Sequence, residues 1–193
     1  MQPFLQNLTI RPAQAADIPS VAAFLSGLSQ RSLYLRYLMP LPSLALERAV
    51  EEARRLCNGE RARVTLVALA GDEQVVGLAE LVRDRQDATI AEVAIVVADQ
   101  YQRVGIGTLL SDRLAAYAPG AQIRIIRAYS LPHNHAVRHL FARSGRPFSS
   151  DTRQGLTCYQ LSLAGTYVLG RRQKCATLPF KGGVTATIFH AIM

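Results

Sequence analysis

The sequence predicts a mixed α/β fold, built around a largely antiparallel sheet. Three observations support this fold class. Runs rich in Val and Ile alternate with amphipathic helical patterns in the order β-α-α-α-β-β-β-α-β-α-β. Two of the strand runs are separated by Gly71-Asp72, a pair typical of the turn in an antiparallel hairpin. A later strand leads through a glycine-rich turn directly into a helix.

The first third of the chain is predicted to be mainly helical. A short strand at Leu8–Ile10 is followed by helices from Asp17 to about Leu28, at Ser32–Leu38, and from Ser43 to Gly59. Asp17 and Ser43 are residues that commonly cap a helix N-terminus, and Gly59 is a common stop signal. In the third helix, apolar residues recur at helical spacing, which indicates one buried face.

The rest of the chain alternates between strands and helices. Strands are expected at Val64–Ala70, Val75–Val82, Ile90–Ala98, Gln122–Ala128 and Leu156–Leu163. Helices are expected at Gly107–Tyr117 and from Asn134, a capping residue, to Gly145. A length of 193 residues is most consistent with one domain.

The composition is that of a globular protein and disfavours several functional classes. Apolar residues make up 49% and charged residues 19% of the chain, which argues against disorder. There is no apolar run of 18 residues, and the first residues do not resemble a secretion signal, so we expect a cytoplasmic protein with no membrane partner. The net charge is +8, but no acidic residue follows Asp151, so much of the excess lies at the C-terminal end. We therefore expect no specific nucleic-acid binding.

The turn QRVGIGT, residues 102–108, joins a strand to a helix and could hold an anion. Free backbone N–H groups at a helix N-terminus attract anions, often phosphates. A dinucleotide-binding fingerprint needs a third glycine where this chain has Leu110, and a Walker loop needs a lysine, whereas the first lysine here is Lys174. On its own, the turn is equally consistent with a tight strand-to-helix connection.

Two segments resemble the GNAT superfamily of N-acetyltransferases. The run VVADQYQRVGIGTLLSDRL is similar to motif A of that family, whose core Q/R-x-x-G-x-G/A is filled by Gln102, Gly105 and Gly107. The segment LPHNHAVRHLFARSG is similar to motif B, with Asn134 at the asparagine position, and LSQRSLYLRYLMPLP resembles bacterial protein lysine acetyltransferases. We therefore expect a GNAT domain at 1–163 and a C-terminal extension of unknown role at 164–193.

The resemblance implies the GNAT fold, with helices on both faces of the sheet, and acetyl-CoA as the acetyl donor. It implies CoA contacts from the backbone of Ile95 and Val97, from Gln102, Arg103, Val104, Gly105, Ile106, Gly107 and Thr108, and from Asn134 and Phe141. The implied reaction is direct transfer to an amine acceptor in a ternary complex. A protein lysine and a small-molecule amine are both open as acceptors, and a non-catalytic acyl-CoA-binding regulatory module is the alternative from another class.

Glu92 is the best candidate for the general base. An amine such as lysine must lose a proton before it attacks, at a cost of roughly 4–5 kcal/mol at pH 7. Glu92 interrupts the apolar run ATIAEVAIVV, so we expect its carboxylate to be desolvated and its pKa to be raised. The related protein acetyltransferases carry a catalytic glutamate at a similar strand position. A structural ion pair for Glu92 is the alternative, and Glu80 is the reserve candidate.

The acceptor side is expected to include Tyr34, Arg36 and Tyr37, as judged from the resemblance, together with Glu80. The alternative is the ordinary packing of a short helix.

The motif-B helix departs from the family pattern at one position. Many GNAT enzymes have a tyrosine there as general acid, whereas this chain has Phe141, so solvent or Tyr159 is left to protonate the departing thiolate. Phe148 can replace the aromatic residue that usually follows the motif-B glycine. His135 and His139 have a spacing that can hold zinc, but no third ligand is evident, so we expect no metal.

Overall fold

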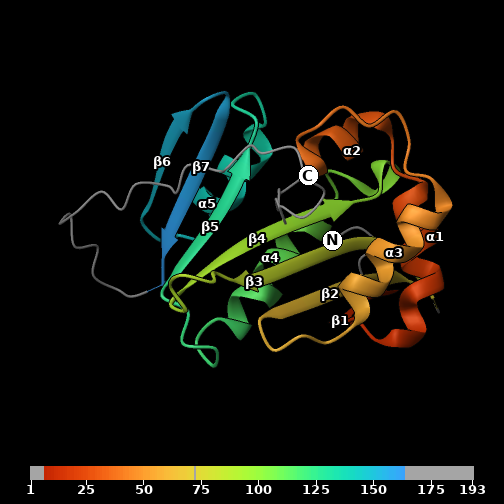
Figure 1. Ribbon diagram of the computed structural model, residues 1–193. Helices are drawn as coiled ribbons and strands as arrows, with labels where there is room; N and C mark the ends of the chain where they lie inside the picture. Colours follow the sequence, from red (N-terminus) through yellow and green to blue (C-terminus); the bar gives the residue numbers. More distant parts are fainter. Residues whose placement is uncertain (1–6, 72, 164–193) are drawn as a thin grey trace.

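The computed structural model describes residues 7–71 and 73–163. Within these residues, seven strands form one sheet in the order β1-β2-β3-β4-β5-β7-β6 (Figure 1). The strands are β1 Leu8–Pro12, β2 Arg63–Ala70, β3 Gln74–Arg83, β4 Ile90–Val97, β5 Ile125–Ser130, β6 Phe148–Arg153 and β7 Leu156–Ser162. All neighbours pair antiparallel except β4 and β5, which are parallel. The largely antiparallel sheet expected from the sequence is confirmed.

In the described part of the chain, five α-helices cover both faces of this sheet (Figure 1). The helices are α1 Ile18–Ser26, α2 Gln30–Tyr37 and α3 Leu46–Cys57 on one face, and α4 Ile106–Tyr117 and α5 His135–Arg143 on the other. Alternation along the strands creates two apolar cores, because successive side chains point to opposite faces. Leu78 and Val96 pack with α1–α3, whereas Ala79 and Ile95 pack with α4 and α5.

Strands β4 and β5 separate along their length. Their parallel ladder covers Ile90–Glu92 of β4 and Ile125–Arg127 of β5. β4 then continues to Val97, and the two strands point in different directions (Figure 1). Among the described residues, the second half of β4 therefore has no ladder partner on its β5 side.

The hairpin of β6 and β7 was not predicted as a pair. The sequence of β6, FSSDTR, is polar and mostly exposed, as expected for a strand at the edge of a sheet. Its turn is formed by Gln154 and Gly155, whose φ angles of 49° and 78° fit the two-residue turns of hairpins. The pair Gln154-Gly155 was the sequence signal for this strand.

Three predicted element starts are wrong. Helix α2, expected from Ser32, begins at Gln30 after its N-cap residue Ser29. The strand expected from Gln122 begins at Ile125, because Gln122 has a φ of 57° and its N–H donates to the carbonyl of Pro119 in a turn. Helix α3 has Ala45 rather than Ser43 at its N-cap. The extension predicted at 164–193 lies outside the described residues. The helices that the structure describes are all too short or too polar to cross a membrane.

Candidate active site

The glycine loop turns sharply between β4 and α4. Arg103 and Gly105 have φ angles of 63° and 100°, and α4 begins directly after Gly105. At Gly105 this backbone conformation favours glycine, because a side chain would be strained there. The loop and the first turn of α4 line a cavity of about 450 Å³, together with Val97 and Tyr101. A helix N-terminus beside a cavity is well suited to bind an anion.

The structure brings most of the expected cofactor residues to this cavity. Its lining includes Val97, Gln102, Arg103, Gly105, Gly107 and Thr108. Val104 and Ile106 instead pack their side chains against the core beneath α4. The side-chain amide of Gln102 is used within the protein: its Nε2 donates to the carbonyl of Val97 at 3.0 Å and to Ser32 Oγ at 3.2 Å.

A second cavity, of about 240 Å³, lies between α4, α5 and the sheet. Thr108, Asp112 and Arg143 line both cavities, so the two are adjacent. Ile95 and Phe141, two of the residues expected to contact the cofactor, line the second cavity. Asn134, which precedes α5, is buried at 7% exposure and does not line either cavity.

Glu92 lies at the last rung of the β4–β5 ladder, opposite Arg127. Strand alternation places it on the α1–α3 side of the sheet, whereas Ile95 faces the cavity on the α4–α5 side. The residue is partly exposed. Burial raises the pKa of its carboxyl to about 7, the negative charge of Asp84 adds to this shift, and Arg127 opposes it. A carboxyl with such a pKa can exchange protons at neutral pH, as a general base must.

Sequence reasoning missed three neighbours of Glu92. Arg127 Nη1 lies 3.9 Å from Asp84 Oδ2. Together, Arg127 and Asp84 form a charged pair beside Glu92. Tyr129, two residues further along β5, is buried, and burial and the charge of Glu92 raise the pKa of its phenol. The sequence did contain a signal for Arg127. Arg127 is a charged residue within the mainly apolar segment IRIIRAYS, just as Glu92 is a charged residue within its own apolar strand.

Three aromatic residues pack together beside the second cavity. The ring centroid of Phe141 lies 5.8 Å from that of Phe148 and 5.5 Å from that of Tyr159. Phe148 therefore packs on Phe141 from the unpredicted strand β6. Tyr159 is 5% exposed and packs in the core on the α4–α5 side, on the opposite face from Glu92.

The two tyrosines expected on the acceptor side belong to α2. Tyr34 is exposed, at 36%. Tyr37 is half-buried, and the guanidinium of Arg36 lies 5.5 Å from the centroid of its ring. Burial raises the pKa of the Tyr37 phenol.

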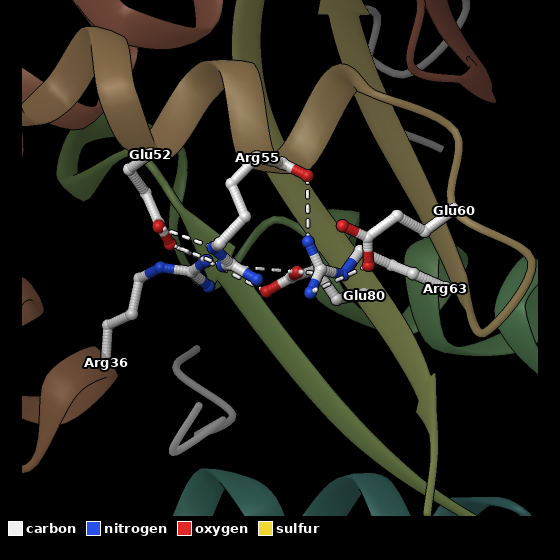
Figure 2. Close-up of polar contacts among 6 residues, drawn as sticks. All are labelled: Arg36, Glu52, Arg55, Glu60, Arg63 and Glu80. Carbon is white, nitrogen blue, oxygen red and sulfur yellow. Dashed lines mark hydrogen bonds and ion pairs between the residues drawn. The ribbon is translucent and has the colours of Figure 1, made fainter. Parts of the chain in front are cut away.

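Arg36 and Glu80 lie in what we call the buried ion cluster, whose members are Arg36, Glu52, Arg55, Arg63 and Glu80 (Figure 2). Figure 2 shows the guanidinium groups of Arg36, Arg55 and Arg63 around the carboxylate of Glu80, with Glu52 beside Arg36 and Arg55. Arg36 Nη2 lies 3.1 Å from Glu80 Oε2, and Arg55 Nη2 and Arg63 Nε lie 3.4 and 3.7 Å from Glu80 Oε1.

This location corrects the expectation that Arg36 and Glu80 line the acceptor side. Their side chains are 3% and 0% exposed, so neither can reach an acceptor without leaving the cluster. Burial raises the pKa of Glu80, and the three guanidinium groups oppose that shift. Glu80 is enclosed by permanent cations, and it has no route by which to take a proton from a substrate.

His135 and His139 are exposed on α5. Among the described residues, no group of three His, Cys, Asp or Glu side chains is arranged to hold a metal ion.

The described residues thus form a mixed α/β fold in which the sheet opens between β4 and β5, beside a carboxyl with a raised pKa and a glycine loop that lines a cavity. The sequence profile of the Acetyltransferase (GNAT) family matches residues 31–145, more than half of the chain, so the chain belongs to the GNAT acetyltransferase family. The resemblance inferred from the two motifs is thereby confirmed.

Individual relatives agree with this membership. Acetyltransferase Pat of Mycolicibacterium smegmatis is 38% identical over 71 residues, which are 37% of this chain and 21% of that protein. The match therefore spans about a fifth of the length of that relative. The GNAT domain of S. lividans PAT superposes with a TM-score of 0.70 at 25% identity, over 80% of this chain and 89% of that domain. Spermidine N-acetyltransferase from Vibrio cholerae, in complex with CoA and spermine, shares the fold with a TM-score of 0.63 at 18% identity, over 81% of this chain and 96% of that one.

Proposed function

We propose that this acetyltransferase moves an acetyl group from acetyl-CoA directly to a primary amine, with Glu92 as the general base and a protein lysine as the acceptor. One observation carries the proposal. Glu92 has a pKa raised to about 7 and stands where β4 and β5 begin to separate, three residues before the cavity-lining Ile95.

The residues around the two cavities fit a CoA thioester. The turn at Arg103–Gly105 and the N-terminus of α4 offer N–H groups and a partial positive charge to the pyrophosphate. The second half of β4 offers backbone groups with which the pantetheine amides can pair as an added strand would. Phe141 provides an apolar wall in the second cavity. Acetyl-CoA itself supplies the acetyl group in the activated form of a thioester.

Glu92 removes the proton that keeps the acceptor unreactive. A lysine with a pKa of about 10.4 needs roughly 4–5 kcal/mol to become neutral at pH 7. A carboxyl with a pKa of about 7 is ionised in a large fraction of the molecules at that pH, and it is basic enough to offset part of this cost. Backbone N–H groups of β4 beyond Glu92 can donate to the carbonyl oxygen on which negative charge develops.

A protein lysine is the acceptor that the similarities favour. The α2 segment resembles bacterial protein lysine acetyltransferases, and the chain is similar to Acetyltransferase Pat and to the GNAT domain of S. lividans PAT. The acceptor would approach from the α1–α3 side, where Glu92 is partly exposed and Tyr34 is exposed. A folded protein is large enough to present a lysine there while it contacts the surface of α2.

Turnover of acetyl-CoA by the full chain tests the acceptor. We expect CoA release with peptides that contain one lysine, and none with the same peptides in which arginine replaces the lysine. Turnover with free polyamines and not with peptides would replace the protein acceptor by a small-molecule amine. Binding of acetyl-CoA without turnover of any amine would instead support a non-catalytic acyl-CoA-binding module.

The variant Gly105→Val tests the cofactor site. Gly105 has a φ of 100°, and a β-branched side chain there strains the turn and occupies the space that the pyrophosphate needs. We expect affinity for acetyl-CoA to fall by about tenfold or more, measured by calorimetry. Gly155→Val is the matched control, because Gly155 also has a positive φ, 78°, but lies in the β6–β7 turn. Normal affinity in a folded Gly105→Val protein would contradict the proposed cofactor site.

A further inference from the structure

Helix α2 is attached to its surroundings by polar contacts at two points. Ser32 and Arg36 are both buried, at 1% and 2% exposure, and they lie four residues apart on the same face of the helix. Arg36 reaches Glu80 on β3 within the buried ion cluster. Ser32 reaches the glycine loop. Helix α2, which carries Tyr34, therefore connects the sheet to the glycine loop, the segment between β4 and α4 that would hold the cofactor.

Asp99, in the short 3-10 helix Asp99–Tyr101 that follows β4, receives the contacts from α2. Ser29, the N-cap residue of α2, donates to it from its backbone N–H at 3.0 Å and from Oγ at 2.5 Å. Ser32 Oγ donates to it at 2.8 Å. Desolvation raises the pKa of the Asp99 carboxyl, but these hydrogen bonds outweigh it and hold that pKa below its ordinary value. The N-terminus of α2 is thus bound to an ionised group of the loop.

Gln102 completes the connection. Its Nε2 donates to Ser32 Oγ at 3.2 Å and to the carbonyl of Val97, at the end of β4, at 3.0 Å. The hydroxyl of Ser32 therefore donates to one loop residue and accepts from another. Both loop residues precede the turn at Arg103–Gly105 that would hold the pyrophosphate, and Gln102 is directly bonded to its first residue.

We propose that Ser32 and Asp99 are positioning residues that couple the cofactor loop to α2, so that CoA binding orders the acceptor side of the enzyme. The inference rests on the proposed role of the loop as the CoA site. A bound pyrophosphate restricts the loop backbone, and Asp99 and Gln102 pass that restriction to Ser29 and Ser32. Because coupling between two binding events is reciprocal, an acceptor bound on α2 strengthens CoA binding by the same factor.

Hydrogen exchange of the full chain with and without CoA tests the coupling. In the wild-type protein we expect CoA to slow exchange of the α2 amides, residues 34–37, by about tenfold. In Ser32→Ala and in Asp99→Ala we expect less than about twofold slowing, although calorimetry still detects CoA binding. Ser26→Ala is the matched control: its Oγ is buried at the end of α1 and has no hydrogen-bond partner among the described residues, so it should behave as the wild type.

The outcomes separate this inference from the proposed function. If CoA binds the wild-type protein but leaves α2 exchange unchanged, or slows it equally in both variants, the coupling is wrong and the cofactor site stands. If CoA does not bind the wild-type protein, the proposed function and the coupling fail together. Should Ser32→Ala be unfolded by circular dichroism, Asp99→Ala decides the matter, because Asp99 is on the surface.

Discussion

Glu80 and Glu92 stand on neighbouring strands and on the same face of the sheet, yet their surroundings differ. Glu80 pairs across the β3–β4 ladder with Ala94, two residues from Glu92. The side chain of Glu80 is fully buried, and three guanidinium groups of the buried ion cluster lie 3.1 to 3.7 Å from its oxygens. Glu92 is partly exposed, and the charges that act on it are one cation, Arg127, and one anion, Asp84.

Burial raises the pKa of both carboxyls, so burial alone does not identify a base. The number of cations and the access of solvent distinguish the two residues. Glu80 lies within ion-pair distance of three guanidinium groups and has no contact with solvent, so its carboxyl serves to organise its neighbours. A carboxyl that has one cation and one anion as charged neighbours, and a pKa of about 7, can take up and release a proton at little cost. The same residue type on one sheet face can therefore be structural at one position and chemical at another.

Glu92→Gln should produce the largest effect on catalysis. Glutamine keeps the size of the side chain but cannot accept the proton, so kcat should fall about 10²–10⁴-fold, measured by CoA release. Affinity for acetyl-CoA should be unchanged, because the CoA cavities lie on the other side of the sheet. A variant with normal kcat, or one that loses acetyl-CoA binding, would show that Glu92 does not act as the base.

The pH profile sharpens this test. Glu92 must be ionised to act, so kcat/KM of the wild-type enzyme should rise through about pH 7. In Glu92→Gln that rise should be lost, and the residual rate should continue to increase at higher pH as more free amine forms.

Glu80→Gln should affect stability rather than the chemical step. It leaves Arg36, Arg55 and Arg63 with only the carboxylates of Glu52 and Glu60 as partners within the cluster, and removing one partner of a buried ion pair typically costs about 3–5 kcal/mol. We expect a fall of about 3 kcal/mol in the free energy of unfolding, measured with urea. Glu51→Gln, an exposed position on α3, is the control and should change it by less than about 0.5 kcal/mol. If Glu80→Gln is fully stable but has lost the rise of kcat/KM through pH 7, the roles of the two glutamates are reversed.

Much of the site could be predicted from local sequence. Glu92 could be proposed as a candidate because a lone acidic residue in an apolar strand is visible in the sequence itself. The glycine loop was found because Gly105 and Gly107 follow a strand and begin a helix. Both signals depend on residues close together in the chain, where periodicity and turn chemistry are informative.

The partners of Glu80 could not be predicted in the same way. Glu80 is also a lone acidic residue in an apolar strand, so its local pattern matches that of Glu92. The difference comes from Arg36, on α2, and Arg55, on α3, which reach Glu80 only when these helices pack on the sheet. Ion pairs over such sequence separations follow from tertiary packing, and no local periodicity specifies them. The contact between Ser32 and Asp99 was missed for the same reason.

Asp84→Asn should produce the smallest effect and tests the balance of charges around Glu92. The negative charge of Asp84 disfavours ionisation of Glu92, and Asp84 also lies 3.9 Å from Arg127, the cation that favours it. Asparagine removes the charge and keeps an oxygen to accept the N–H groups of Gln86 and Asp87. The pKa of Glu92 should therefore fall, and the midpoint of kcat/KM should move from about pH 7 to lower pH, by about half a unit for the loss of one nearby charge in a partly solvated site. Asp87→Asn makes the same charge change on the same loop, and Asp87 does not contribute to the shift of Glu92, so its midpoint should not move. A midpoint that stays in place in Asp84→Asn, or moves equally in both variants, would mean that burial alone sets the pKa of Glu92.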